Sequence, residues 1–224
     1  MVYYPVFLDL RGRSCLVIGG GKEAQRKVEG LLAAEGRVTV VSPALTDGLQ
    51  QLLEAERIEW VQREYRDGDV EGYDVCMVAT DDGAVNAQVA AEGKRRRVWV
   101  NAADDPGNCD FILPAVIRRG TITVAASTGG ASPALARRLR EELEAYLTEE
   151  MPALAELLKE VRADLRSRGI MPDPEVWQDA IDEELRVLLA QRKQRQAKAR
   201  LLKSLGAEEL VGELVTVESG GSTP

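Results

Sequence analysis

The sequence predicts an α/β fold: a parallel sheet with crossover helices, then a small central α+β element, then a helical region. Three observations carry this prediction. Short apolar runs alternate with segments of helical period over the first hundred residues, which is typical of a parallel sheet. Two β-prone segments stand close together after residue 105, and beyond residue 150 apolar residues recur at helical spacing. The N-terminal half is therefore expected to be a Rossmann-type sheet.

The N-terminal part contains five short runs that read as strands, most of them rich in branched apolar residues. They are residues 14–18, 37–41, 58–61, 75–79 and 98–100. Helices are expected between them. After the first strand and a glycine turn, Ala24, Val28, Leu31 and Leu32 recur at helical spacing. Further helices are expected over 45–53 and around 86–91.

The second half begins with a predicted hairpin, whose strands 111–117 and 121–126 flank a short turn. Ser132 and Pro133 then suit the N-cap and the first position of a helix. Apolar residues of helical period continue from 151 to 206, and the composition of the last residues is typical of disorder. The expected division is 1–110 (Rossmann domain), 111–148 (central element), 149–217 (helical domain) and 218–224 (disordered tail).

Composition excludes several classes of protein. With 45% hydrophobic and 29% charged residues among 224, the chain is globular, and no apolar run approaches the roughly 18 residues of a membrane span. The first ten residues have no signal-peptide pattern, so a cytoplasmic protein is expected. The chain contains no histidine, which removes histidine zinc sites and Ser-His-Asp or Cys-His catalysis. Its three cysteines form no C-x-x-C pair, and its net charge of −8 argues against non-specific nucleic-acid binding.

The glycine turn after the first strand matches the pattern G-x-G-x-x-[GA]. Gly19 and Gly21 allow a tight turn and a close approach of the backbone to a pyrophosphate, while the small Ala24 lets the helix pack on the strand. The helix N-terminus at Lys22 and Glu23 adds N–H groups and a partial positive charge. We expect a dinucleotide site here, although such glycines can also serve the turn alone.

The second strand ends at Ser42 and Pro43, where many dinucleotide-binding domains carry an acidic residue. Ser42 could bind a ribose hydroxyl. No arginine lies between 38 and 56 to receive a 2′-phosphate. The sequence therefore favours NAD over NADP.

Residues 101–106, from Asn101 to Pro106, follow the fifth strand, at the edge where ligands bind open α/β sheets. In a chain without histidine, a partly desolvated aspartate placed here is the most plausible proton acceptor. Asp104 and Asp105 also suit a solvated turn, and composition alone favours the turn.

Two further segments carry clustered polar or basic residues. Ser127, Thr128, Gly129 and Gly130 lie before a predicted helix that carries Arg137, and they form either an anion nest for a carboxylate-rich ligand or an ordinary helix cap. The basic run at 192–203 could contact RNA or a partner. It contains no aromatic residue for base stacking, so a solvated helix face is the better interpretation.

Together these segments resemble the precorrin-2 dehydrogenase module of siroheme synthesis, which occurs alone or as the N-terminal half of siroheme synthases. The resemblance rests on strings at residues 4–10, 19–28, 79–86, 101–106, 111–115 and 127–137. They follow one another in the order and spacing of the family and cover residues 4 to about 147. Residues 150–224 match only as a generic helical tail.

The resemblance implies NAD-dependent oxidation of precorrin-2 to sirohydrochlorin by a homodimer. It implies that Asp104 is the catalytic aspartate, which reverses the preference for a turn there. Thr80 and Asn101, in the matching strings that follow the fourth and the fifth predicted strands, are assigned to the cofactor site. Some family members also insert ferrous iron, and the absence of histidine counts against that activity here more than against oxidation.

The substrate carries several acetate and propionate groups, so its site needs local positive potential. The candidate substrate-binding residues are Arg118, Arg119, Arg137, Gly129 and Gly130, with either Ser127 or Thr128 at the pocket. The alternative function is a module that senses NAD or a tetrapyrrole and contacts a partner through its basic tail. Such a module could dispense with Asp104.

Overall fold

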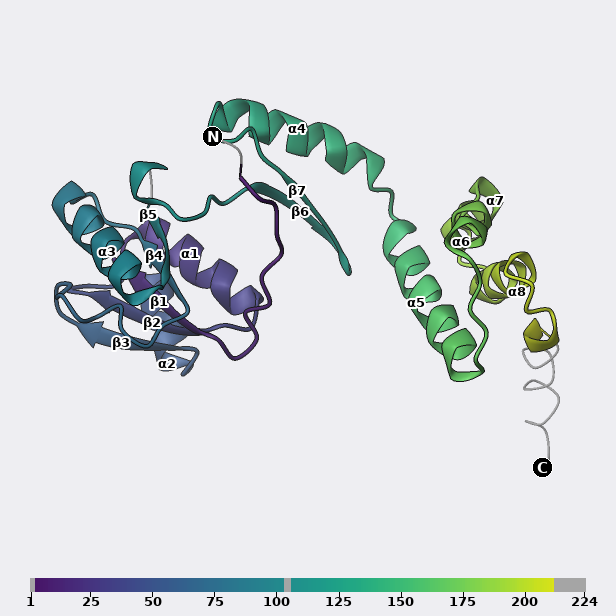
Figure 1. The fold of residues 1–224 in the computed structure, drawn as a ribbon, viewed down its shortest axis with the longest axis horizontal. Helices are drawn as coiled ribbons and strands as arrows, with labels where there is room; N and C mark the ends of the chain where they lie inside the picture. Colours follow the sequence, from purple (N-terminus) through teal and green to yellow (C-terminus); the bar gives the residue numbers. More distant parts are fainter. Residues whose placement is uncertain (1–2, 103–105, 212–224) are drawn as a thin grey trace. The chain divides into compact units, whose positions relative to one another are not determined.

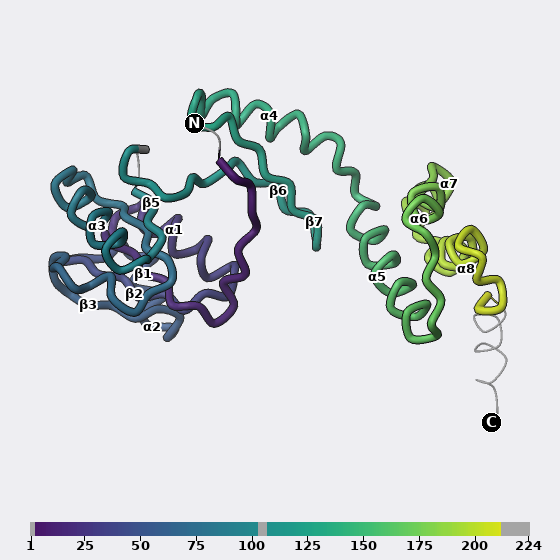
Figure 2. Tube along the Cα trace, in the orientation of Figure 1, coloured from purple at the N-terminus to yellow at the C-terminus, as the bar shows by residue number. Residues whose placement is uncertain are grey.

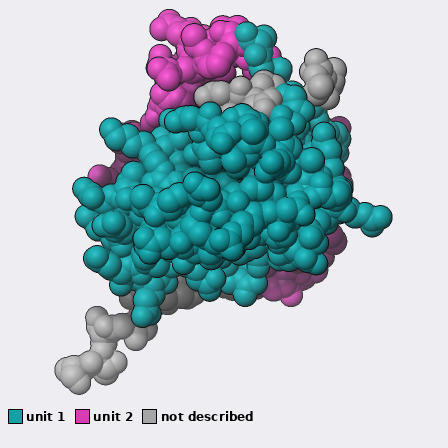
Figure 3. Space-filling view, turned by 90° about the vertical axis from the view of Figure 1, so that its left-hand side faces the viewer, with its two compact units in different colours: residues 1–113, 129–131 teal, residues 114–128, 132–224 magenta. Residues whose placement is uncertain are grey.

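The structure is a computed structural model that describes residues 3–102 and 106–211 (Figure 1, Figure 2). The chain divides into two compact units, residues 1–113 with 129–131 and residues 114–128 with 132–224 (Figure 3). The finer division at residues 110, 148 and 217 stays a prediction, and the segment 218–224 lies outside the described residues.

The sheet of the first unit is parallel and has the strand order β3-β2-β1-β4-β5 (Figure 1). Its strands are β1 (Ser14–Ile18), β2 (Arg37–Ser42), β3 (Ile58–Gln62), β4 (Val75–Val78) and β5 (Trp99–Ala102). The first strand is central, and the order reverses between β1 and β4. Ligands bind open α/β sheets outside the carboxyl ends of the strands at such a reversal. The predicted Rossmann-type sheet is confirmed, with strand ends shifted by at most two residues.

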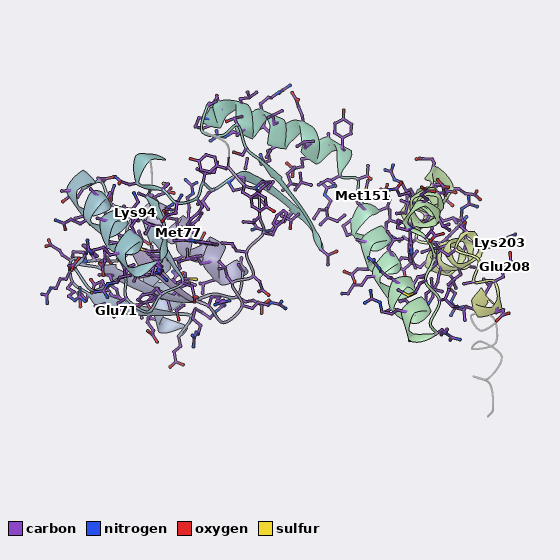
Figure 4. The ribbon with its side chains drawn as sticks, viewed as in Figure 1. Glu71, Met77, Lys94, Met151, Lys203 and Glu208 are labelled. Atoms are coloured by element: carbon purple, nitrogen blue, oxygen red, sulfur yellow. The ribbon has the colours of Figure 1, made fainter. Side chains whose placement is uncertain are left out.

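Helices cover both faces of this sheet. They are α1 (Lys22–Ala33), α2 (Asp47–Glu54) and α3 (Gly83–Arg96), and a short 3₁₀ helix, η1 (Pro106–Asn108), follows β5. Val17 of β1 packs in one buried cluster with Val28 of α1, whereas Leu16 of β1 packs in a second cluster with Val89 of α3. Met77 of β4 belongs to the first cluster (Figure 4). Alternate strand residues thus face opposite layers, as a sheet buried on both faces requires.

The second unit begins with an antiparallel hairpin of β6 (Ala115–Arg119) and β7 (Ile122–Ala126), in which Arg119 pairs with Ile122. The hairpin is confirmed, but the predicted start of its first strand at residue 111 is wrong. Phe111 packs against the core of the first unit, and its carbonyl accepts a hydrogen bond of 2.9 Å from Asn101 Nδ2. Pro114 has no N–H to donate to a ladder. These contacts hold the chain before Ala115 out of the hairpin.

Five helices complete the second unit. They are α4 (Pro133–Tyr146), α5 (Met151–Ser167), α6 (Pro174–Ala180), α7 (Glu183–Ala190) and α8 (Gln194–Ser204). Leu157 of α5, Leu185 of α7 and Leu201 of α8 pack in one buried cluster, which confirms the predicted helical region. None of the helices in the described part of the chain is long and apolar enough to cross a membrane.

Two basic residues of the run at 192–203, Lys198 and Arg200, pair with acidic side chains of neighbouring helices. Lys198 Nζ donates to Glu160 Oε1 at 2.6 Å and to Asp164 Oδ2 at 3.1 Å. Arg200 pairs with Asp182 and, at 2.8 Å, with Glu184. These ion pairs join α8 to α5 and α7, so this part of the run stabilises the helical region itself.

Candidate dinucleotide site and active site

The glycine turn between β1 and α1 contains two glycines that the fold itself requires. Gly19 has a φ of +119°, and a β-carbon there would lie 2.3 Å from the carbonyl oxygen of Ala79. A β-carbon on Gly20 would lie 1.8 Å from the carbonyl oxygen of Ala44. These close approaches join the turn to the ends of β4 and β2. Gly20 was not among the predicted site residues, although it is packed as tightly as Gly19.

Gly21 differs from its neighbours, because nothing in the described fold requires a glycine there. Its φ is −83°, which any residue adopts, and a β-carbon would meet no atom within 4 Å. Gly21 is also the N-cap of α1, and no side chain caps this helix start. The first N–H groups of a helix need partners from outside the helix. An open space in front of uncapped N–H groups fits the pyrophosphate of a dinucleotide.

Lys22 and Glu23 occupy the first turn of α1. Lys22 is exposed, whereas Glu23 is half-buried and pairs with Arg26 at 3.0 Å. A carboxylate in the first turn would repel a phosphate, and this ion pair offsets part of its charge. The positions of both residues suit the rim of the predicted site.

Ser42 and Pro43 lie at the end of β2, beside the glycine turn. Ser42 is 2% exposed, and its Oγ donates to the carbonyl of Ala44 at 2.8 Å and accepts from Trp60 Nε1 at 3.2 Å. The hydroxyl proton is therefore already donated within the protein. A ribose contact from this hydroxyl stays a prediction and would need the turn to rearrange, whereas Pro43 is exposed at this edge.

Thr80 follows β4 and shapes the start of α3. Its Oγ1 donates to Asn86 Oδ1 at 2.9 Å, and the side chain of Asp82 caps α3 by accepting from Ala84 N at 2.8 Å. Asn86 is buried, and its Nδ2 donates to the carbonyl of Thr80 at 3.4 Å. Thr80 thus lies at the carboxyl edge of the sheet, as predicted, with its hydroxyl oriented by Asn86.

Asn101 of β5 is buried and holds together three parts of the first unit. Its Oδ1 accepts a hydrogen bond of 2.9 Å from Lys27 Nζ of α1, and its Nδ2 donates to the carbonyl of Phe111 at 2.9 Å. Lys27 is only 7% exposed. Sequence reasoning missed Lys27, although its position on the apolar face of α1, between Ala24 and Leu31, was a usable signal.

The proposed proton acceptor, Asp104, and its neighbour Asp105 lie outside the described residues, so their roles stay predictions. In the described chain beyond them, Asp110 contacts β5. The N–H of Asp110 donates to the carbonyl of Val100 at 2.8 Å, and its carboxylate accepts from Val100 N at 2.9 Å. This pair covers the outer edge of β5 and closes the base of the loop.

The residues predicted to bind substrate lie around the hairpin and the start of α4. Thr128 Oγ1 donates to the carbonyl of Ser132 and accepts from its N–H, both at 3.1 Å. Gly129 and Gly130 have φ of +63° and +88°, as an anion nest or a tight turn requires. The structure therefore gives Thr128 a role in this turn. The residues with side chains toward solvent here are Ser127, Arg118 and Arg137, while Arg119 is half-buried.

No three His, Cys, Asp or Glu side chains come together as a metal-binding group anywhere in the described ranges 3–102 and 106–211.

The parallel sheet with its glycine turn defines a dinucleotide-binding α/β domain, and comparison with known proteins agrees. A family model described as NAD(P)-binding matches residues 6–115, and a second, described as sirohaem biosynthesis protein central, matches residues 119–146. A solved structure, "SirC, precorrin-2 dehydrogenase", superposes on this chain with a TM-score of 0.73 at 29% sequence identity. The superposition covers 90% of this chain and 100% of the SirC chain.

Curated sequences extend the match to the whole chain. A siroheme synthase of Photorhabdus laumondii is 36% identical over an alignment of 226 residues that covers 100% of this chain and 48% of that protein. A siroheme synthase of Thioalkalivibrio sulfidiphilus is 37% identical over an alignment of 232 residues that covers 100% of this chain and 47% of that protein. The chain thus spans about half the length of these relatives. It belongs to the family formed by the siroheme synthase N-terminal region and the precorrin-2 dehydrogenase SirC, which confirms the resemblance seen in the sequence.

Proposed function

We propose that this chain is a precorrin-2 dehydrogenase that oxidises precorrin-2 to sirohydrochlorin with NAD. Family membership supports the activity, and the match to SirC extends over 90% of the chain. The observation on the molecule that carries the proposal is the space at Gly21. That space has no structural purpose in the described residues, and it lies in front of an uncapped helix N-terminus, where a pyrophosphate would bind.

The reaction removes a hydride and a proton from the reduced macrocycle. NAD supplies the hydride acceptor when bound. The backbone N–H groups at the start of α1 would bind its pyrophosphate, and Thr80 and the end of β5 would border the nicotinamide end. The proton needs a base on the protein, and we assign that role to Asp104, because aspartate is the most suitable base at this edge in a chain without histidine.

We propose NAD rather than NADP from the surroundings of Pro43. The strand register places Gln62 of β3 opposite Ser42. The next residue, Arg63, therefore lies close to this end of β2 and could supply a positive charge to a 2′-phosphate. Arg63 is occupied by Asp69, to which it donates two hydrogen bonds of 2.7 Å. A 2′-phosphate would need a cation that is not already paired. The family model by itself covers both cofactors.

We propose that the carboxylates of the substrate bind Arg118, Arg119 and Arg137. In α4, Arg138 pairs with Glu142 at 2.7 Å and Arg140 with Glu144 at 3.0 Å. Among the described residues, no acidic side chain forms an ion pair with Arg118, Arg119 or Arg137. These three arginines therefore keep their positive charge for a ligand, and the turn at Gly129 and Gly130 adds backbone N–H donors.

We also propose a homodimer, because α4 has no buried residue in the described chain. Leu135 is 50% exposed and Leu143 is 37% exposed on the apolar stripe of this helix. A two-stranded hairpin is too small to form a core of its own. A second copy that packs against this stripe would remove it from water and close a symmetric interface.

The proposal is tested by mixing the purified protein with NAD and enzymatically generated precorrin-2. NADH absorbance is expected to rise together with the sirohydrochlorin spectrum, and neither should appear without the protein. Binding of NAD without any turnover would instead support the sensing module.

A further inference from the structure

Lys27 is a buried cation for which the proposed reaction has no role so far. It lies in the second turn of α1, with 4% of its side chain exposed, and its Nζ is 2.9 Å from Asn101 Oδ1. Glu23, one turn earlier on the same helix, is 4.0 Å away and 43% exposed. Burying an ammonium group is costly unless it makes strong polar contacts.

A neutral side chain could donate to Asn101 with a smaller cost of desolvation. Lysine adds length and charge: its stem reaches from α1 across to β5, and a charged donor makes a stronger hydrogen bond than a neutral one. The choice of lysine therefore indicates that a firm connection between α1 and β5 matters more here than the cost of burying a charge.

The connection joins two parts of the site with different tasks. Lys27 belongs to the helix whose N-terminus would bind the cofactor. Asn101 belongs to the strand that leads into the loop with Asp104, and its Nδ2 donates to Phe111, where that loop has already returned to the core. One carboxamide thus bridges the cofactor helix and both ends of the loop.

We propose that Lys27 is a positioning residue, which acts through Asn101 to hold the end of β5 and Phe111 against the cofactor helix. The proposal rests on the proposed function, because the alignment it provides is that of the hydride acceptor with the base. Small errors in such an alignment lower the rate of the chemical step strongly and leave binding almost unchanged.

The test uses Lys27→Met, which keeps the apolar stem and removes the ammonium. Lys94→Met is the matched control, because Lys94 is an exposed lysine on α3 of the same unit and belongs to neither the proposed cofactor site nor the proposed active site. Lys27→Gln, which keeps a neutral donor, is the second variant should Lys27→Met fail to fold. Two measurements are made on each: amide hydrogen exchange of residues 99–111 without cofactor, and kcat and KM for NAD and precorrin-2.

In Lys27→Met we expect faster exchange over residues 99–111 and unchanged exchange over β1 and β2. We expect kcat to fall on the order of 10-fold or more, with both KM values within about two-fold of wild type. Lys27→Gln should show the same pattern to a smaller degree, and Lys94→Met should match wild type.

Unchanged exchange and kcat in a folded Lys27 variant would overturn the proposal. So would a raised KM for NAD at unchanged kcat, which would make Lys27 a cofactor-binding residue, or an equal effect of Lys94→Met. Wild-type protein that fails to oxidise precorrin-2 would contradict the proposed function alone, because the exchange measurement does not depend on turnover.

Discussion

Gly19 and Ala79 approach so closely that a β-carbon on residue 19 would lie 2.3 Å from the Ala79 carbonyl oxygen. The contact joins the ends of β1 and β4, between which the strand order reverses. The N–H of Ala79 donates to the carbonyl of Ile18 at 2.8 Å, and the N–H of Gly19 donates to the carbonyl of Val41 at 2.9 Å. Backbone contacts thus fix the floor of the candidate dinucleotide site without any ligand.

The first prediction distinguishes the proposed ligand-binding role of Gly21 from the structural role of Gly19 and Gly20. Gly21→Asp should keep or raise the melting temperature, because aspartate is a favoured N-cap and the space at residue 21 is open. The same carboxylate would occupy the pyrophosphate space, so NAD affinity in calorimetry should fall on the order of 10²-fold or more.

Gly20→Ala is the control for that experiment. Its β-carbon would meet the Ala44 carbonyl oxygen, and overpacking of this kind destabilises by about 1–3 kcal/mol or more. A Gly21→Asp protein that binds NAD as wild type does would show that the pyrophosphate lies elsewhere.

The second prediction concerns the choice of cofactor. NAD should bind at least several-fold more tightly than NADP, because Ser42 and Pro43 offer no cation to a 2′-phosphate and Arg63 is held by Asp69. Calorimetric titrations with both cofactors measure the ratio. Equal affinities for NAD and NADP would contradict the proposal that the end of β2 offers no cation to the 2′-phosphate.

The third prediction is that the protein is a dimer at micromolar concentration in sedimentation experiments. Leu143→Glu places a charge on the exposed apolar stripe of α4 and should shift the protein to monomer. Val187→Glu changes a residue of α7 that is 42% exposed, and it should leave the dimer intact. A wild-type monomer, or equal effects of both variants, would count against the α4 interface.

The fourth prediction concerns the pH dependence of stability. The hydrogen bonds from Arg63 hold the pKa of Asp69 below its ordinary value of 3.8. Since the folded-state pKa is the lower one, the interaction stabilises fully above the unfolded-state pKa and is lost as pH falls through the folded-state pKa. At pH 7, Asp69→Asn should lower the free energy of unfolding by about 1–3 kcal/mol.

Denaturant titrations of both proteins from pH 7 to pH 3 measure this difference. It should shrink as the pH falls below 3.8. A difference that stays constant over the whole range would mean that the charge of Asp69 contributes nothing to stability.

The sheet and the glycine turn were predictable because their signals are local. Five apolar runs and the spacing of Gly19, Gly21 and Ala24 suffice to place a dinucleotide site at one edge. The start of β6 was not predictable, because Phe111 is as β-prone as its neighbours and is held in the first unit by tertiary contacts with Asn101 and the core.

The polar contacts of the site depend on residues far apart in sequence. From the sequence, the hydroxyl of Ser42 was expected to be available to a ligand. In the structure it accepts a hydrogen bond from Trp60, which lies 18 residues later in the chain. Lys27 and Asn101 are 74 residues apart. No local pattern contains such a pair, although a lysine on the apolar face of a helix is a signal that a buried partner exists.

The fifth prediction concerns the proposed base. Asp104→Asn keeps the shape of the side chain and removes its basicity, so turnover should fall on the order of 10²-fold or more with NAD affinity almost unchanged. Asp105→Asn, the matched control, should lose no more than a few-fold. Near wild-type turnover of Asp104→Asn, or a larger loss in Asp105→Asn, would show that the base is another group.

The stoichiometry of the reaction distinguishes an NAD-dependent dehydrogenase from a module that only binds NAD. Purified wild-type protein is mixed anaerobically with NAD and a limiting amount of precorrin-2, and NADH and sirohydrochlorin are quantified together. We expect equal amounts of the two products from wild type, and a much slower appearance of both from Gly21→Asp at the same NAD concentration. Sirohydrochlorin formed without NADH, or no reaction although NAD is bound, would contradict the assignment of this chain as an NAD-dependent precorrin-2 dehydrogenase.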